Sequence, residues 1–218
     1  MSGASAQYYQ DLAAAFVRGH RADAPSLPDA EIIAWGQKQG LRLHKFKRNS
    51  ELPRVRRVLG MLRSLVEDGG TLVDIGSGRG TFLWPLLAAF PGLRVTAVDL
   101  DPVRVRDLRA VRDGGIERLA VTRADACALP LPDRSADIVT LLEVLEHLPE
   151  PGLAAQRALS VARRAVIASV PSKEDDNPEH IQLFDGRSLQ ALLLRAGARQ
   201  VRIEYVLNHM IALALPHP

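Results

Sequence analysis

Four residues in the second half of the sequence have the side chains and spacing of a site for metal or acid–base chemistry. Glu143, Glu146 and His147 stand at positions i, i+3 and i+4, so one helical turn would place all three on the same side. His180 follows in a polar segment punctuated by prolines. Two carboxylates and two imidazoles can hold a divalent cation and leave positions open for substrate oxygens. Either histidine can instead act as a general base without a metal.

A glycine-rich turn and two further acids precede this block. The turn, LVDIGSGRGTF at 72–82, contains one acid and three glycines: Asp74, Gly76, Gly78 and Gly80. Glycines in such a turn let the backbone approach a ligand closely. The G-x-G-x-G spacing departs from the dinucleotide fingerprint G-x-G-x-x-G, because Thr81 stands at the last place. Asp99 ends the next apolar run, where a carboxylate can accept hydrogen bonds from both hydroxyls of a ribose, and Asp125 closes the run after that.

In this order the segments strongly resemble the class I S-adenosylmethionine-dependent methyltransferases. The resemblance covers about residues 55–216 and rests on DIGSGRG, VDLDP, the Ala-Asp pair at 124–125, LPLPDRSADIVTLLEVLEH and a closing hairpin. It implies that S-adenosylmethionine contacts Asp74, Gly76, Gly78, Gly80, Asp99, Leu100, Asp125, Ala126 and Glu143. On this likeness Asp74 and the three glycines flank the methionine part of the donor. Asp99 binds the ribose, while Asp125 and Ala126 lie at the adenine. A Rossmann-like domain that binds NAD, or one whose glycines only form turns, is the alternative.

The Glu-x-x-Glu-His block with a later histidine is similar to two branches of this superfamily. One branch methylates the 2′-hydroxyl of the 3′-terminal ribose of small RNAs, and in it two Glu and two His hold the metal. The other comprises ubiquinone-pathway O-methyltransferases, whose acceptor is a catechol. The likeness implies that Glu143, Glu146, His147 and His180 hold Mg²⁺ or Mn²⁺ and carry the catalysis of O-methylation. Because Glu-His-Leu is also widespread in class I methyltransferases without an ion, a metal-free site stays open.

The charge distribution bears on the acceptor. Between Arg42 and Arg63 the sequence has eight Lys and Arg against one acid, Glu51, in a chain whose net charge is only +3. A basic stretch can bind a phosphate backbone, although many charge runs are solvated helix faces. The basic stretch therefore slightly favours the ribose hydroxyl of an RNA as the methyl acceptor over a small-molecule hydroxyl, such as that of a catechol or a natural-product intermediate. A catalytically silent donor-binding module is a third possibility. His209, at the expected hairpin turn, is interpreted as structural.

The site residues depend on an alternation of strands and helices after Gly70. The strands that we expect are 71–75, 95–98, 119–122, 138–142 and 165–170, followed by a hairpin of 200–206 and 209–215. Helical patterns fall at 80–89, 102–112, 152–163 and 187–195. Such alternation predicts an α/β fold with a doubly wound, mostly parallel, seven-stranded Rossmann-like sheet that ends in an antiparallel hairpin.

The N-terminal quarter of the sequence is predicted to be helical. Helices are expected at 5–18 and 29–38, and a third from Pro53 up to Gly69. We therefore expect a helical extension over residues 1–52, which acts as a lid on the donor pocket or contacts the substrate, and a methyltransferase domain over 53–218.

Composition limits the remaining possibilities. Uncharged apolar runs are far shorter than the roughly 20 residues of a membrane-spanning helix. The N-terminus lacks the basic region of a signal peptide, so a cytoplasmic monomer or homodimer is expected. Cys127 is the only cysteine, which excludes an internal disulfide and leaves carboxylates and imidazoles as metal ligands.

Overall fold

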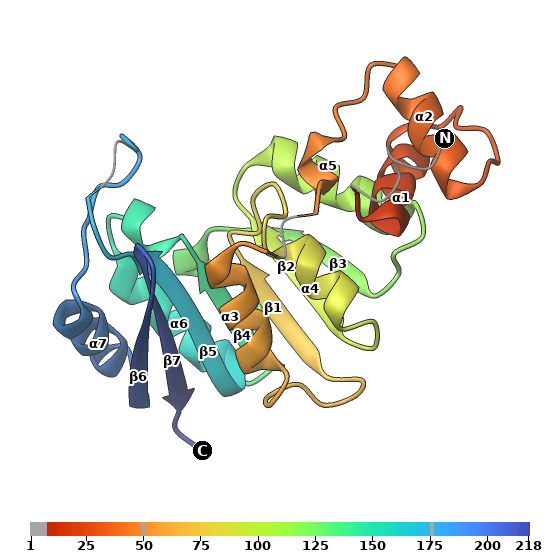
Figure 1. The fold of residues 1–218 in the computed structure, drawn as a ribbon. Helices are drawn as coiled ribbons and strands as arrows, with labels where there is room; N and C mark the ends of the chain where they lie inside the picture. The colour runs from red at the N-terminus through yellow and green to blue at the C-terminus, as the bar shows by residue number, and fades with distance from the viewer. Residues whose placement is uncertain (1–7, 49–50, 175–176) are drawn as a thin grey trace.

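A single sheet forms the centre of the protein, whose computed structural model describes residues 8–48, 51–174 and 177–218 (Figure 1). In this part of the chain seven strands pair in the order β3-β2-β1-β4-β5-β7-β6. The pairs among the first five strands are parallel, and β7 lies antiparallel between β5 and β6. Their bounds are β1 Thr71–Ile75, β2 Arg94–Asp99, β3 Leu119–Arg123, β4 Ala136–Leu142, β5 Ala162–Pro171, β6 Ala198–Val206 and β7 His209–Pro216. The predicted fold class is confirmed.

Helices cover both faces of this sheet, which explains why the central strands are apolar along almost their whole length. One face packs against α3 (Pro53–Leu62), α4 (Leu83–Ala89) and α5 (Pro102–Asp113). The other packs against α6 (Pro151–Val161) and α7 (Gly186–Arg195). The strands therefore end in a shared edge between two helical layers, and the loops at that edge carry the predicted site residues.

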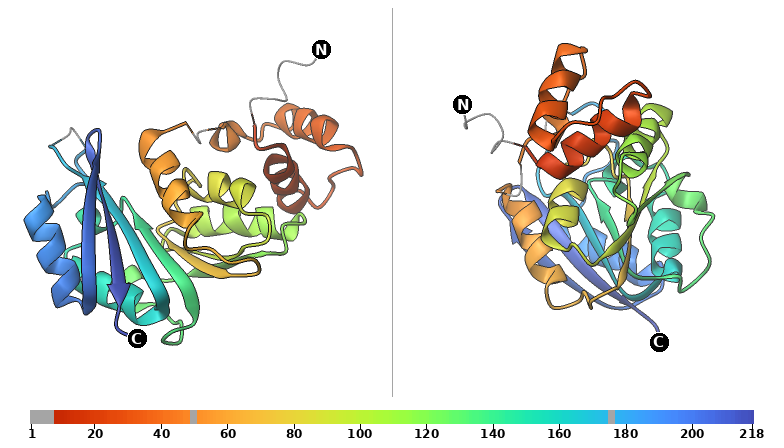
Figure 2. Two further views of the ribbon diagram at one scale, coloured as in Figure 1. Left: turned by 60° about the horizontal axis from the view of Figure 1, so that its bottom comes forward. Right: turned by 90° about the vertical axis from the view of Figure 1, so that its right-hand side faces the viewer.

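The N-terminal helices pack on the α3–α5 side of the sheet. α1 (Gln10–His20) lies against α5, and α2 (Asp29–Lys38) lies outside α1 (Figure 2). The helices α1 and α5 approach so closely that a Cβ on Gly114 would lie 1.8 Å from the carbonyl oxygen of Ala15. The short 3-10 turn η2 (His44–Phe46) brings the Phe46 ring to 5.0 Å from Trp84 of α4, centroid to centroid. The extension predicted for 1–52 thus shares one apolar core with this helical layer in its described part.

Several helix boundaries differ from the predictions, and for two of them the structure shows a local cause. α3 ends at Leu62 instead of reaching Gly69. Beyond it Ser64 Oγ donates a 2.9 Å hydrogen bond to the Met61 carbonyl, a local bond that competes with helix continuation. α4 begins at Leu83, later than the predicted 80, because Gly80 has a φ of +84° that no helix residue adopts. The first helix begins at Gln10, and residues 5–7 of its predicted range lie outside the described residues.

None of the helices in the described ranges has the length and apolar character needed to cross a bilayer.

Candidate donor and acceptor site

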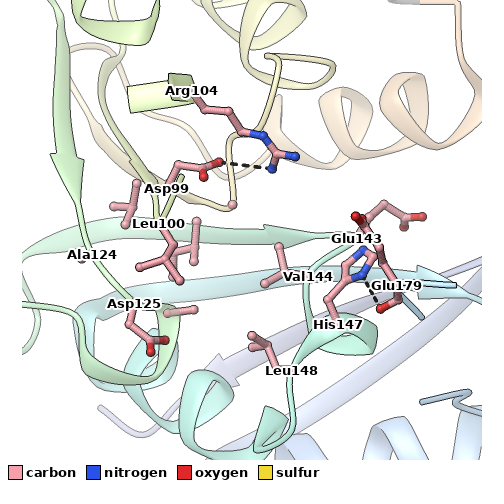
Figure 3. Close-up of a pocket in the computed structure, with 14 residues that line it drawn as sticks. Asp99, Leu100, Arg104, Ala124, Asp125, Glu143, Val144, His147, Leu148 and Glu179 are labelled. Carbon is pink, nitrogen blue, oxygen red and sulfur yellow. Dashed lines mark hydrogen bonds and ion pairs between the residues drawn. The ribbon is translucent and has the colours of Figure 1, made fainter. Parts of the chain in front are cut away.

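A cavity of about 390 Å³ opens where β1, β2, β3 and β4 end, and we call it the donor cavity. Asp99, Leu100 and Asp125 lie on one side of it, and Glu143, His147 and Glu179 lie on the other (Figure 3). The residues predicted to contact the donor that line this cavity are Gly76, Asp99, Leu100, Asp125, Ala126 and Glu143. Of that predicted set, Asp74, Gly78 and Gly80 are not among the lining residues that the structure describes.

Two glycines of the turn stand where a larger side chain would not fit. A Cβ on Gly76, whose φ is +71°, would lie 2.4 Å from Val144 Cγ2. A Cβ on Gly80 would lie 2.0 Å from Trp84 Cε2. Both distances are far below van der Waals contact, so larger residues would displace neighbours of the cavity. The turn is therefore held close against β4's end and α4.

Asp99 is oriented by two backbone hydrogen bonds. Its Oδ2 accepts from Gly78 N at 2.7 Å, and its Oδ1 accepts from Asp101 N at 2.9 Å. Each carboxylate oxygen keeps further lone pairs that can accept from a ligand hydroxyl. Arg104, in the first turn of α5, has Nη1 3.9 Å from Asp99 Oδ2 (Figure 3). The acid predicted for the ribose thus lies at the cavity in a fixed orientation.

Asp74 lies inside the sheet rather than at the cavity surface. Thr140 Oγ1 donates a 2.7 Å hydrogen bond to Asp74 Oδ1, and Ser77 Oγ donates to the Asp74 carbonyl at 2.9 Å. Burial raises the pKa of the Asp74 carboxyl to about 6, although the Thr140 hydroxyl acts in the opposite direction. Its predicted contact with the methionine part of the donor stays a prediction.

The block at 143–147 does not form the expected helical turn from its first residue. The 3-10 turn η4 covers only Leu145–His147, and Glu143 has a φ of +58°. A non-glycine residue in this left-handed region costs on the order of 1–2 kcal/mol. Glu143 N donates to the Ser169 carbonyl of β5 at 2.9 Å, which holds that conformation in place. The prediction that Glu143, Glu146 and His147 share one side of a helical turn is therefore wrong.

Glu146, His147 and His180 are brought together. One ligand atom from each lies within 4.8 Å of the other two, and Glu143 does not belong to this group of described residues. The loop that carries His180 is bound to η4 by Ile181 N and Gln182 N, which donate to the Glu146 carbonyl at 3.0 and 3.2 Å. The Glu146 side chain is buried. We call this set the Glu146–His147–His180 cluster.

The tautomer of His147 follows from its partner. His147 Nδ1 lies 2.9 Å from the Glu179 carbonyl oxygen, and a carbonyl only accepts, so Nδ1 carries the hydrogen. In the neutral ring Nε2 then has the lone pair that a metal requires, and the Nδ1–H bond fixes the ring. Together with a buried carboxylate and a second imidazole, this donor set fits a divalent cation.

Acids dominate the charged groups of the donor cavity. Asp99, Asp125, Glu143 and Glu179 line it, against a single guanidinium, that of Arg104, among the described lining residues. Carboxylates attract a sulfonium cation and repel a pyrophosphate. The cavity therefore suits a cationic nucleoside better than a dinucleotide.

Comparison with known proteins agrees with this geometry. Residues 73–168 match the family model described as "Methyltransferase domain". This match, the similar proteins and the fold together support a class I S-adenosylmethionine-dependent methyltransferase. The chain is 36% identical over 104 residues to an uncharacterized methyltransferase of Mycobacteroides abscessus, a match that covers 46% of this chain and 38% of that protein. It is 34% identical over 97 residues to the ubiquinone biosynthesis O-methyltransferase of Cupriavidus pinatubonensis, a match that covers 44% of this chain and 38% of that protein.

The chain thus matches well under half the length of these curated relatives. Among solved structures, a SAM-dependent methyltransferase from Aquifex aeolicus superposes with a TM-score of 0.64 at 23% identity, over 78% of this chain and 93% of that chain. That similarity shows the fold.

Sequence reasoning missed several residues of the site. Arg104, Leu148 and Glu179 line the donor cavity, and Ser169 and His209 contact Glu143. A signal existed for Leu148, which completes the Glu-His-Leu sequence, and for Arg104, which stands two residues after VDLDP. Ser169 and His209 come to the site only through strand pairing, which a single sequence does not reveal.

Proposed function

We propose that this methyltransferase transfers the methyl group of S-adenosylmethionine to a hydroxyl oxygen of a small-molecule acceptor. The observation that carries the proposal is the position of His147, which lines the donor cavity and also belongs to the Glu146–His147–His180 cluster. An acceptor oxygen at this cluster is adjacent to the donor. Holding the oxygen behind the methyl carbon supplies a large part of the acceleration of such a transfer.

The cluster is the proposed place of a divalent cation, Mg²⁺ or Mn²⁺. Glu146, His147 Nε2 and His180 would hold it, and such an ion lowers the pKa of a coordinated hydroxyl. Glu143, also predicted as a ligand, has Ser169 and His209 as its partners instead.

Two observations support a small acceptor over RNA. A relative with a matching segment is a ubiquinone biosynthesis O-methyltransferase. In addition, part of the basic stretch is neutralised within the chain: Lys45 pairs with Asp107, Arg57 with Glu204 and Arg56 with Glu51. These ion pairs lower the charge available for a phosphate backbone.

The 2′-hydroxyl of an RNA ribose is the second candidate acceptor, because Arg42, Lys47, Arg48 and Arg63 of the same stretch are exposed. Binding to RNA through these cations would weaken steeply with added salt, because each neutralised phosphate releases counterions. Salt-insensitive or absent binding of a labelled RNA oligonucleotide would exclude it.

The test is a transfer assay with a methyl-labelled donor, a panel of catechols and an RNA with a free 3′-terminal ribose. We expect labelled catechol ether, loss of turnover in EDTA and recovery with Mn²⁺. Calorimetry should detect binding of S-adenosylhomocysteine and no binding of NAD. Donor hydrolysis without transfer to any acceptor would instead indicate a catalytically silent donor-binding module.

A further inference from the structure

Glu143 belongs to a second group of polar side chains on the acceptor side of the donor cavity. Ser169, fully buried on β5, donates a 2.7 Å hydrogen bond from Oγ to Glu143 Oε1. Glu143 Oε2 lies 3.1 Å from Nε2 of His209, the first residue of β7. Glu143 also lines the donor cavity. Glu143 therefore lines the cavity while its carboxylate contacts an imidazole of β7.

The Nε2 atom of His209 has two neighbours with opposite requirements. Besides Glu143 Oε2, it lies 3.4 Å from Nη1 of Arg54 on α3. A hydrogen on Nε2 can be donated to the carboxylate, whereas a lone pair there can accept from the guanidinium. One nitrogen cannot do both at once. The geometry thus allows a proton to lie on either side of the Glu143–His209 contact without movement of heavier atoms.

Another arginine of α3 is already paired with an acid. One turn after Arg54, Arg57 forms a two-pronged ion pair with Glu204 of β6, with distances of 2.5 and 2.7 Å. The strand neighbours of His209 are Pro171 on β5 and Val206 on β6, and neither is ionisable. In the described part of the chain, Arg54 and Glu143 are therefore the charged residues that lie in direct contact with the His209 ring.

We propose that Glu143 and His209 form a proton-accepting dyad for the acceptor hydroxyl. The inference rests on the proposed O-methyl transfer. The acceptor O–H bond breaks and its proton goes to the Glu143 carboxylate. The oxygen electron pair forms the new bond to the methyl carbon, and the pair of the broken C–S bond stays on sulfur, which leaves S-adenosylhomocysteine. The proton passes to His209, whose partly exposed ring returns it to water.

The two residues have different roles in this dyad. Glu143 touches the substrate and is catalytic. His209 acts through Glu143 and is a positioning residue that also carries the proton away. The Ser169 hydroxyl, and the bond from Glu143 N to the Ser169 carbonyl, fix the position of the carboxylate. The left-handed conformation of Glu143 makes sense in this arrangement, because it turns the side chain toward β5 and β7 and away from η4.

The test compares His209→Ala, His209→Gln and Glu143→Gln with the wild-type enzyme, and His44→Gln is the control at an exposed histidine. We expect His209→Ala to lower kcat about 100-fold, with little change in acceptor KM or in affinity for S-adenosylhomocysteine. Added imidazole should restore much of that turnover, because it can carry the proton. Glu143→Gln should be slow and should not respond to imidazole.

Several outcomes would overturn the dyad. Wild-type turnover in His209→Ala would do so, and so would a loss that imidazole does not relieve, because a merely structural histidine gives that result. If His209→Ala fails to bind S-adenosylhomocysteine, His209→Gln decides: slow turnover with normal binding supports the dyad, and wild-type turnover refutes it. Absence of turnover in the wild-type enzyme would instead remove the proposed function itself, and the dyad with it.

Discussion

Thr140 and Asp74 face each other across the central pair of parallel strands, with the Thr140 hydroxyl 2.7 Å from Asp74 Oδ1. The carboxyl is almost completely buried, and burial raises its pKa to about 6 from 3.8. Between these values the folded chain binds more protons than the unfolded chain, so this group makes the protein less stable as pH rises from about 4 to about 6. The loss amounts to about 3 kcal/mol.

Asp74→Asn should remove that loss. The amide oxygen can still accept from Thr140, and no charge is buried at neutral pH. We expect the variant to be more stable than the wild-type protein at pH 8 and equal to it near pH 4, by urea unfolding at both values. A stability difference that is the same at both pH values would show that Asp74 does not titrate in this range.

Gly80→Ala should destabilise the fold through a clash with Trp84. The new Cβ would lie 2.0 Å from Trp84 Cε2, and the φ of +84° adds backbone strain, so we expect a loss of about 3 kcal/mol in the free energy of unfolding. Gly40→Ala is the matched control, because Gly40 has a φ of +81° and its Cβ would meet nothing within 4 Å. The control should lose only about 1 kcal/mol. Equal losses would contradict the clash.

Asp99→Asn should weaken binding of the donor product. The variant loses the charge that is predicted to accept hydrogen bonds from the ribose hydroxyls, and a hydrogen bond to a charged group contributes about 1.5–3 kcal/mol. We expect the Kd of S-adenosylhomocysteine in calorimetry to rise about 10- to 100-fold. Asp113→Asn, an exposed acid at the end of α5, is the control and should bind as the wild type does. An unchanged Kd in Asp99→Asn would place the ribose elsewhere.

Mn²⁺ binding should distinguish the Glu146–His147–His180 cluster from the Glu143–His209 dyad. Glu146→Gln and His180→Gln each remove a ligand of the Glu146–His147–His180 cluster, and we expect Mn²⁺ affinity to fall by more than about tenfold. Glu143→Gln should keep Mn²⁺ binding, because its carboxylate is directed to Ser169 and His209. Calorimetry with Mn²⁺ alone is sufficient. Loss of binding in Glu143→Gln would return that residue to the ligand set.

The strands were predictable because each contains a short apolar run that includes β-branched residues. β1 matches its predicted range of 71–75, and β2, β3, β4, β6 and β7 extend beyond their own predicted ranges by one or two residues. β5 begins three residues earlier than predicted, because Ala162 continues directly from α6. The positions of Asp99 and Asp125 at the cavity follow from those strand ends.

The residues around Glu143 were not predictable in the same way. Its left-handed backbone is set by the bond to β5 and not by residue type, since a glutamate has no preference for that conformation. His209 was interpreted as structural because it stands at a turn. Its contact with Glu143 depends on the insertion of β7 beside β5, a pairing between residues that are distant in sequence.

The tight contact between Ala15 on α1 and Gly114, which directly follows α5, has a practical consequence for anyone who shortens this chain. α5 begins beside Asp101 and carries Arg104 at the rim of the cavity. In a version that starts at residue 53, the side of α5 that packs against α1 would be exposed to water, so the helix that carries Arg104 would lose part of its support. Such a truncation is therefore expected to damage the end of the cavity around Asp99 and Arg104, even though no residue there is deleted.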